Sequence, residues 1–213
     1  MFNSIDGEVN CFEGAGQFST FIRFAGCSLG CKYCDTVYAQ DKDSGELLSV
    51  DEIWRRVERM GCNKITITGG EPLEQNEGLF ELLYTRPFCH DISIETNGAH
   101  HIEQYDGFKN VRFVMDYKLP SSGVYDKMIN KNLELLEPED YVKFVIQDFH
   151  DYKIAKGLLP WIEAKIAFAP VWGKLDPRKL VEWIQKDKLY NVHLNVQLHK
   201  YIWSECVNSE IEK

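Results

Sequence analysis

The stretch CSLGCKYCDT, residues 27–36, places three of the seven cysteines of the chain within eight residues. Cys27, Cys31 and Cys34 follow the spacing C-x3-C-x2-C. Thiolates hold iron–sulfur clusters, usually with one cysteine for each iron. Three thiolates on a four-iron cluster leave one iron open to a ligand that the protein does not supply. The stretch therefore predicts an iron–sulfur cluster with an open position.

Two other interpretations of these cysteines stay open at this point. A structural zinc site has four protein ligands, usually two cysteine pairs or a cysteine pair with histidines nearby. The six histidines all lie far away in sequence: His90, His100, His101, His150, His193 and His199. A zinc site would therefore need a remote fourth ligand. The remaining interpretation is a group of cysteines that binds no metal.

A second motif, TGGEP (68–72), directly follows the apolar run KITI (64–67). Two adjacent glycines suit a tight turn between a strand and a helix, which is the ordinary explanation of such a motif. Backbone amides exposed in that turn, beside the Glu71 carboxylate, also suit a zwitterionic ligand.

Short β-branched and aromatic runs alternate with helical patterns along the chain. The predicted strands lie at 18–24, 64–67, 91–96, 111–116, 141–146, 165–169 and 192–197, and the predicted helices at 49–60, 76–84, 127–136, 149–159 and 176–186. This alternation predicts an α/β fold with a parallel sheet. A full (β/α)8 barrel takes about 250 residues. A chain of 213 residues with a long N-terminal loop therefore predicts a partial (β/α) barrel, as a single domain over 1–213.

Composition and charge narrow the class of protein. Hydrophobic residues make up 44% of the chain and charged residues 27%, as in ordinary globular proteins. A net charge of −9 argues against nucleic-acid binding, which needs a basic surface, and favours a small-molecule substrate. The chain shows neither an apolar run of about 18 residues nor a signal-peptide pattern, so we expect no membrane association. An odd number of cysteines with one tight cluster is typical of intracellular metal binding, and we expect a cytoplasmic protein.

The cysteine spacing, with the aromatic Tyr33 before the last cysteine, and the GGEP motif together resemble the radical S-adenosylmethionine (SAM) superfamily. The resemblance implies a partial barrel of the radical SAM type. It also implies a [4Fe–4S] cluster whose open iron binds the amino and carboxylate groups of SAM. Reduction of that cluster cleaves SAM and produces a 5′-deoxyadenosyl radical.

Further stretches resemble one family within this superfamily, the 7-carboxy-7-deazaguanine synthases. They follow that family in order along the chain: SIDGE (4–8), FIRFAGCSLGCKYCDT (21–36), ITGGEPLEQ (67–75), ETNG (95–98), DYKLPSSG (116–123), KFVI (143–146) and QLHKYIW (197–203). The resemblance implies a carbon–nitrogen lyase of queuosine and 7-deazapurine biosynthesis. It converts 6-carboxy-5,6,7,8-tetrahydropterin to 7-carboxy-7-deazaguanine and ammonia, beginning with hydrogen abstraction at C6. It further implies Mg²⁺, an electron donor such as flavodoxin, and a homodimer.

The same resemblance assigns roles to individual residues. Substrate contacts are expected from Ile5, Asp6, Gly7, Glu8, Arg23, Thr68 and His199. SAM contacts are expected from Tyr33, Cys34, Asp35, Gly70, Glu71, Ser121, Ser122, Gly123, Ala169, Pro170, Val171 and Trp172. The expected metal ligands are Cys27, Cys31 and Cys34 for the cluster and Thr36 for Mg²⁺.

Chemistry supports several of these roles. A pterin presents an amidine-like edge that suits the Glu8 carboxylate, and its own carboxylate suits Arg23. Mg²⁺ takes oxygen ligands, often together with substrate oxygens, as the Thr36 hydroxyl could provide. The ordinary alternatives are an exposed acid at Glu8, a backbone-bonding hydroxyl at Thr36 and a surface histidine at His199.

The N-terminal loop departs from the family pattern. The family motif commonly reads Gln-Gly-Glu-Gly, or Asp-Gly-Glu-Gly in some members. This chain has Asp6-Gly7-Glu8-Val9 and a longer loop that contains CFEGAG (11–16). The geometry of this loop is therefore left open. We expect partly buried free thiols, with no role in the cluster, at Cys11, Cys62, Cys89 and Cys206.

Two competing functions are considered. A glycyl-radical enzyme activase shares the cysteine spacing and a similar length, but it acts on a protein glycine and has no use for the pterin-binding positions. A non-catalytic zinc or iron–sulfur module would explain the cysteines but not GGEP or DYKLPSSG.

Overall fold

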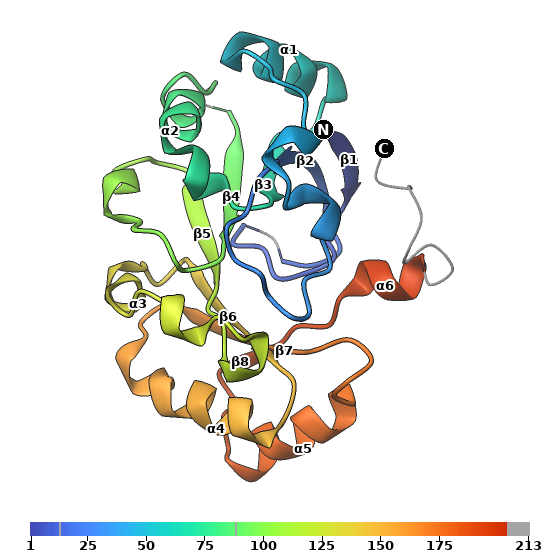
Figure 1. Cartoon of the computed structure of the whole chain (residues 1–213), viewed down its shortest axis with the longest axis vertical. Helices are drawn as coiled ribbons and strands as arrows, with labels where there is room; N and C mark the ends of the chain where they lie inside the picture. Colours follow the sequence, from blue (N-terminus) through green and yellow to red (C-terminus); the bar gives the residue numbers. More distant parts are fainter. Residues whose placement is uncertain (13, 88, 204–213) are drawn as a thin grey trace.

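The computed structural model describes residues 1–12, 14–87 and 89–203. In this part of the chain, one sheet of eight strands runs in sequence order from β1 to β8 (Figure 1). β1 is antiparallel to β2, and each later pair of neighbours is parallel. The strands are β1 (Phe2–Ile5), β2 (Phe18–Phe24), β3 (Lys64–Gly69), β4 (Asp91–Thr96), β5 (Val111–Asp116), β6 (Tyr141–Ile146), β7 (Lys165–Pro170) and β8 (Val192–Leu194).

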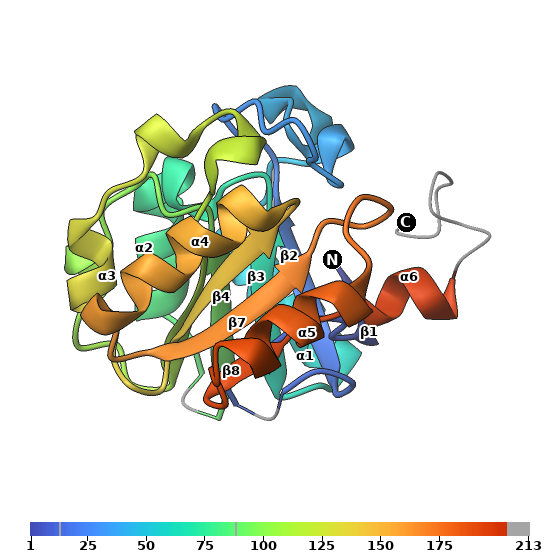
Figure 2. The ribbon, with the colours of Figure 1, turned by 90° about the horizontal axis from the view of Figure 1, so that it is seen from below.

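Helices cover the outer face of the curved sheet (Figure 2). The α-helices are α1 (Val50–Met60), α2 (Asn76–Tyr84), α3 (Lys131–Leu135), α4 (Phe149–Leu158), α5 (Pro177–Lys186) and α6 (Leu198–Ile202). Single 3₁₀ turns are η1 (Val37–Ala39), η2 (Lys42–Ser44), η3 (Pro72–Gln75), η4 (Glu103–Tyr105), η5 (Pro120–Ser122), η6 (Tyr125–Lys127) and η7 (Leu159–Trp161). None of the helices in the described ranges is long and apolar enough to cross a membrane.

The main core lies between the sheet and these helices. Successive side chains of a strand point to opposite faces, so every second residue faces outward. Ile65 and Ile67 of β3 and Ile92 and Ile94 of β4 face outward and are almost completely buried. Each such side chain contributes about 1.5–3 kcal/mol when it is removed from water.

The inner face of the sheet is apolar at one end and polar at the other. At the apolar end, Val9 from the loop between β1 and β2 packs with Val114, Tyr141 and Ala167, with Cys11 beside them. This loop therefore closes the bottom of the partial barrel. Val9, which stands where the family motif commonly has glycine, is therefore a core residue of this loop.

The sheet does not close on itself, and chain segments fill the gap between β8 and β1. The Val9 amide donates to Oδ1 of Asn195 (2.9 Å), just after β8. The Leu198 amide donates to the carbonyl oxygen of Gly7 (2.9 Å). These bonds bring α6 beside β1, as Figures 1 and 2 show.

The structure confirms the predicted single-domain α/β partial barrel and most of its strands and helices. Ser49 accepts a hydrogen bond from the Glu52 amide (3.3 Å) and caps the start of α1. Residues 13, 88 and 204–213 of the predicted 1–213 domain, including Cys206, lie outside the described residues.

Three details of the prediction were wrong. The predicted helix at 127–136 is reduced to α3, because the Met128 backbone is extended and its sulfur accepts a hydrogen bond from the Lys118 amide (3.2 Å). The strand predicted at 192–197 ends at Leu194, because Asn195 turns toward Val9. The short edge strand β1 was not predicted at all.

Candidate active site

The cluster cysteines lie in the loop that follows β2, at the carboxyl edge of the parallel sheet. Such edges gather the active sites of α/β proteins. The Glu71 amide donates to the carbonyl oxygen of Gly26 (2.7 Å), which ties the cysteine loop to the turn after β3. A Cβ on Gly70 would overlap that same Gly26 oxygen, and Gly69 has φ of +120°. The two glycines of the motif are therefore required for the close approach of the two loops.

The three thiols fit the donor set of an iron–sulfur cluster. Cys27, Cys31 and Cys34 are partly buried and free of disulfides. Burial raises the pKa of the Cys27 and Cys31 thiols, while the Lys118 ammonium opposes the effect at Cys31. Across the described residues, no three His, Cys, Asp or Glu side chains converge as a single metal ion would require. A cluster does not need such convergence, because each thiolate binds a different iron, whereas a mononuclear zinc site does.

The Glu71 carboxylate is directed into the protein. Oε1 accepts hydrogen bonds from the Leu73 amide (3.0 Å) and the Thr96 hydroxyl (2.9 Å), and Oε2 accepts one from the Asn97 amide (2.7 Å). The Asn97 side-chain amide in turn lies 3.9 Å from the Cys27 sulfur. Glu71 therefore orders the turn after β3 against the end of β4, directly beside the cluster loop.

The predicted residues after β5 also lie beside the cluster loop. The Lys32 amide donates to the carbonyl oxygen of Ser122 (3.0 Å), and the Tyr33 hydroxyl to that of Val145 (3.4 Å). Asp151 of α4 accepts hydrogen bonds from both the amide and the hydroxyl of Ser121. The structure thus brings together the cysteine loop and the segment 121–123.

A row of alternating charges crosses the polar end of the inner face. Lys143 of β6 pairs with Glu8 and lies 3.4 Å from Asp116 of β5, which also pairs with Lys118 (2.9 Å). Burial alone would raise the pKa of Glu8, but the neighbouring Lys143 lowers it below its ordinary value. Burial would likewise lower the pKa of Lys143, but Glu8 and Asp116 raise it well above the ordinary range. Both groups therefore stay charged.

Glu95 behaves differently from its neighbours in this row. It lies on β4, and its carboxylate accepts a hydrogen bond from the Thr68 hydroxyl (2.5 Å). Burial raises its pKa to about 7, with Lys143 opposing and Asp6 and Glu8 adding to the rise. A carboxyl that titrates near neutral pH at the mouth of a barrel is a candidate functional group.

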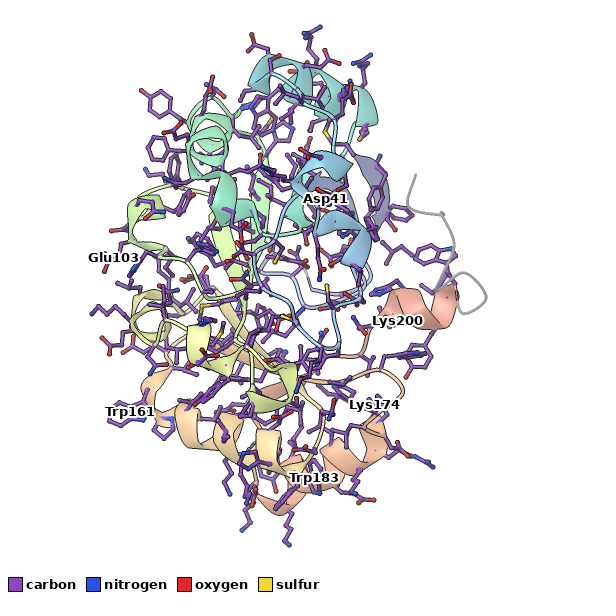
Figure 3. The ribbon with its side chains drawn as sticks, viewed as in Figure 1. Asp41, Glu103, Trp161, Lys174, Trp183 and Lys200 are labelled. Carbon is purple, nitrogen blue, oxygen red and sulfur yellow. The ribbon has the colours of Figure 1, made fainter. Side chains whose placement is uncertain are left out.

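The C-terminal segment completes the site. Nε2 of Gln197 donates to Glu8 (2.7 Å) and to Asp35 (2.9 Å). Lys200, on the side of α6 that faces the sheet, pairs with Asp35 (3.1 Å; Figure 3). His199 packs against Gly7, where a Cβ would collide with the imidazole ring.

Some predicted residues are placed less directly in the site. The Asp6 side chain is buried and accepts hydrogen bonds from Asn10 (2.8 Å) and Thr66 (2.9 Å). The guanidinium carbon of Arg23 lies 5.5–5.9 Å from the ring centres of three aromatic residues, Phe2, Phe21 and Tyr38. Ile5 is the last residue of β1. The Thr36 hydroxyl lies 3.7 Å from the Cys34 sulfur.

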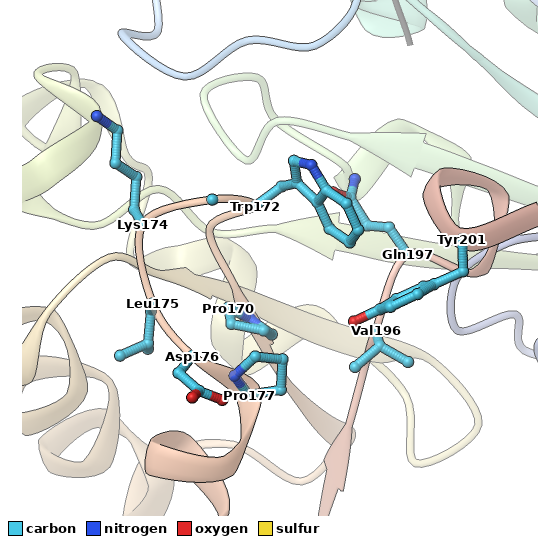
Figure 4. A pocket seen from close by; sticks show the side chains of 10 residues that line it. Pro170, Trp172, Lys174, Leu175, Asp176, Pro177, Val196, Gln197 and Tyr201 are labelled. Carbon is cyan, nitrogen blue, oxygen red and sulfur yellow. The ribbon is translucent and has the colours of Figure 1, made fainter. Parts of the chain in front are cut away.

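The segment after β7, predicted to contact SAM, borders a cavity of about 450 Å³. Ala169 and Pro170 end the strand, and the Val171 amide donates to the carbonyl oxygen of Ile146 (2.9 Å). Trp172, Gln197 and Tyr201 line the cavity on the side of α6 (Figure 4). The cavity therefore opens beside the residue that links Glu8 to Asp35.

Sequence reasoning missed Glu95, Asp116, Lys143 and Gln197, and also the lysines that pair with site carboxylates, Lys118 and Lys200. A signal for the first three was present. Each follows outward-facing apolar residues in its strand, so period-2 alternation turns it inward. Gln197 carried no such signal, because it lies outside any strand.

Comparisons with known proteins agree with this geometry. The sequence model of the radical SAM superfamily matches residues 21–151. A 7-carboxy-7-deazaguanine synthase of Clostridium acetobutylicum is 39% identical over 211 residues, which cover 95% of this chain and 94% of that protein. The synthase of Chlorobaculum tepidum is 40% identical over 96% of this chain and 92% of its own length. The crystal structure of QueE from Escherichia coli shares the fold, with a TM-score of 0.66 and 23% identity over 93% of this chain and 92% of that one.

Proposed function

The chain belongs to the 7-carboxy-7-deazaguanine synthase family of the radical SAM superfamily, and from this premise we propose how its residues hold the reactants. The reaction converts 6-carboxy-5,6,7,8-tetrahydropterin to 7-carboxy-7-deazaguanine in queuosine biosynthesis, so the protein is a carbon–nitrogen lyase. The observation that carries the assignment is identity of 39% over nearly the full length of chain and relative.

Cys27, Cys31 and Cys34 are the proposed ligands of a [4Fe–4S] cluster. When bound, the cluster and SAM supply the 5′-deoxyadenosyl radical that takes a hydrogen atom from C6 of the pterin. The chain contributes a partly buried loop, held by the Gly26–Glu71 and Lys32–Ser122 backbone bonds. Such a loop limits the access of water and fixes the orientation of what it binds.

For SAM, we propose contacts from the four segments that meet at this loop. They are Tyr33, Cys34 and Asp35; Gly70 and Glu71; Ser121, Ser122 and Gly123; and Ala169, Pro170, Val171 and Trp172. Glu71 acts by ordering its turn, since its carboxylate is occupied by Leu73, Thr96 and Asn97. Ser121 is oriented by Asp151.

For the pterin, we propose the inner polar face of the barrel. Glu8, held ionised by Lys143, suits the amidine-like edge of the pterin. Asp6 acts through its backbone together with Ile5 and Gly7, since its side chain is engaged with Asn10 and Thr66. Arg23, Thr68 and His199 complete the proposed set.

Mg²⁺ and the partner proteins are finer parts of the proposal. Thr36 offers an oxygen ligand next to Cys34, and Mg²⁺ commonly takes its other ligands from substrate and water. An electron donor such as flavodoxin and a homodimeric assembly are proposed from family membership. A cytoplasmic location is proposed because free cluster thiols persist in reducing compartments.

An anaerobic turnover assay tests the function. The reconstituted protein, with SAM, a reductant and Mg²⁺, should convert the carboxytetrahydropterin to the carboxydeazaguanine, identified by mass spectrometry. Removal of Mg²⁺ with a chelator should reduce the rate. Cys31→Ala should lose the cluster and the activity, whereas Cys62→Ala, a matched change outside the cluster, should keep both.

A protein with full iron content that cleaves SAM but leaves the pterin unchanged would contradict the function. That outcome would favour the activase alternative, in which the radical is passed to a protein glycine. The buried row of charges formed by Glu8, Lys143 and Asp116 argues against this alternative, because such a row suits a small polar substrate.

A further inference from the structure

The side-chain amide of Gln197 joins two carboxylates that come from distant parts of the chain. Nε2 lies 2.7 Å from Oε1 of Glu8 and 2.9 Å from Oδ2 of Asp35. Both partners accept hydrogen bonds but cannot donate them while they are ionised. The nitrogen, with two N–H groups, therefore faces the carboxylates, and the orientation of the amide is fixed.

Each of the two carboxylates also pairs with a lysine, so the group that bridges them can be an uncharged amide. Lys143 neutralises Glu8 on one side of the amide, and Lys200 neutralises Asp35 on the other. Lys200 approaches the same Asp35 oxygen that accepts the Gln197 hydrogen bond, at 3.1 Å. Gln197 thus bridges the two carboxylates through one nitrogen, and each carboxylate has its own lysine on the other side.

The two carboxylates belong to different halves of the proposed site. Glu8 lies on the inner face of the barrel, where the pterin is proposed to bind. Asp35 lies between the cluster ligand Cys34 and the proposed Mg²⁺ ligand Thr36. A hydrogen bond from one donor to both residues connects the substrate half to the cofactor half in two steps.

The segment that carries Gln197 is itself held on both sides. The Leu198 amide donates to the carbonyl oxygen of Gly7 (2.9 Å). The Tyr201 ring packs edge-on against Trp172, with 5.0 Å between the ring centres. Figure 4 shows Gln197 beside Trp172 and Tyr201 at the border of the cavity. The bridge therefore sits on a fixed support and does not depend on a free side chain.

We propose that Gln197 is a positioning residue that couples pterin binding to SAM binding. The proposal rests on the proposed function of the same site. A pterin bound to Glu8 restricts the Glu8 carboxylate, and through the Gln197 amide it restricts Asp35 and the loop after Cys34. SAM then binds to a loop that has already lost part of its conformational freedom, so it binds more tightly.

The experiment measures binding without turnover. In the reconstituted holoenzyme with the cluster left oxidised, SAM is not cleaved, and its Kd can be measured by equilibrium dialysis with and without saturating carboxytetrahydropterin. In the wild type, the pterin should tighten SAM binding by about fivefold or more. By reciprocity, SAM should tighten pterin binding by the same factor.

Gln197→Met removes both donors at similar length. The variant should lose the coupling, so that the two SAM Kd values agree within about twofold. A purely structural role would shift both Kd values together and leave their ratio unchanged. Gln185→Met, at an exposed position on α5, is the matched control and should keep the wild-type ratio.

Melting temperature and iron content establish whether Gln197→Met is folded and loaded. If it is not, Lys200→Gln provides the second variant, because it removes the ammonium group that pairs with Asp35. This variant should reduce the ratio of the two SAM Kd values at least twofold. If the folded variant kept the wild-type ratio of SAM Kd values, the inference would be overturned. The same holds if the wild type converts the pterin but shows no coupling. Neither outcome would contradict the proposed function. A wild type that does not bind the pterin would overturn the proposed function as well.

Discussion

At the scale of single residues, the inner face of the barrel combines carboxyls held in different states. Burial opposes the charge of these groups, but Lys143 lowers the pKa of Glu8, and Lys118 together with Lys143 lowers that of Asp116. Glu95 lies beside them with a pKa raised to about 7. The inner face of the barrel therefore holds ionised carboxylates next to a carboxyl that takes up a proton near neutral pH.

The raised pKa of Glu95 makes a prediction about stability. Its ordinary value is 4.5, so between pH 4.5 and 7 the folded protein holds a proton that the unfolded chain has released. Stability contributed by this group therefore falls as the pH rises through that interval. Glu95→Gln removes the effect and should be more stable than the wild type above pH 7, by about 1–3 kcal/mol. The difference should shrink toward pH 4.5.

Urea unfolding at several pH values provides the measurement. Glu103→Gln, at an exposed position, is the control and should change the free energy of unfolding by no more than about 0.5 kcal/mol. A difference for Glu95→Gln that does not depend on pH would show that Glu95 does not titrate in this range.

Lys143 shows how far the sequence can predict such a residue. A single charge in the run YVKFVI, between outward-facing apolar residues, indicates a side chain on the inner face. Its partner Glu8 lies 135 residues away, and no local pattern connects the two. The sequence therefore predicts where Lys143 points but not what it neutralises.

At the scale of elements, the site depends on the contact between the cysteine loop and the turn after β3. The motif TGGEP was predicted to bind a ligand or to make a tight turn, and the structure shows a turn whose glycines pack against another backbone. Resemblance could identify the motif, whereas the reason for its glycines required the position of Gly26.

Gly70→Ala tests this contact. The added methyl group would overlap the carbonyl oxygen of Gly26 and displace the cysteine loop. We expect the purified, reconstituted variant to hold less than half of the wild-type iron, measured by iron analysis and by absorbance near 400 nm. Gly78→Ala is the matched control on α2, where an added Cβ meets nothing within 4 Å. It should keep full iron content and gain up to about 1 kcal/mol of stability.

At the scale of the whole molecule, the partial barrel is completed by segments rather than by strands. The loop with Val9 closes the bottom, and the segment around Asn195 and Gln197 closes the side. The strands could be predicted from local patterns of apolar residues. These closures could not, because the bond from Val9 to Asn195 joins residues 186 positions apart.

Val9→Ala tests whether the departure from the family motif is structural. Val9 is 8% exposed and packs against Val114, Tyr141 and Ala167. Its truncation should lower the free energy of unfolding by about 1–3 kcal/mol, measured by urea denaturation. Val37→Ala, at a position that is 62% exposed, should change it by less than about 0.5 kcal/mol. Equal effects of the two changes would refute a core role for Val9.

The link between Gly7, Val9 and the segment after β8 also sets an order of events during synthesis on the ribosome. Strands β2 to β7 and the cysteine loop emerge before Asn195, so they can pair before the segment after β8 is available. The proposed pterin site needs residues from both ends of the described chain, because Gly7 and Val9 bond to Leu198 and Asn195. The cysteine loop can therefore take shape while the inner face of the barrel is still open on the side that the segment with Asn195 and Gln197 later covers.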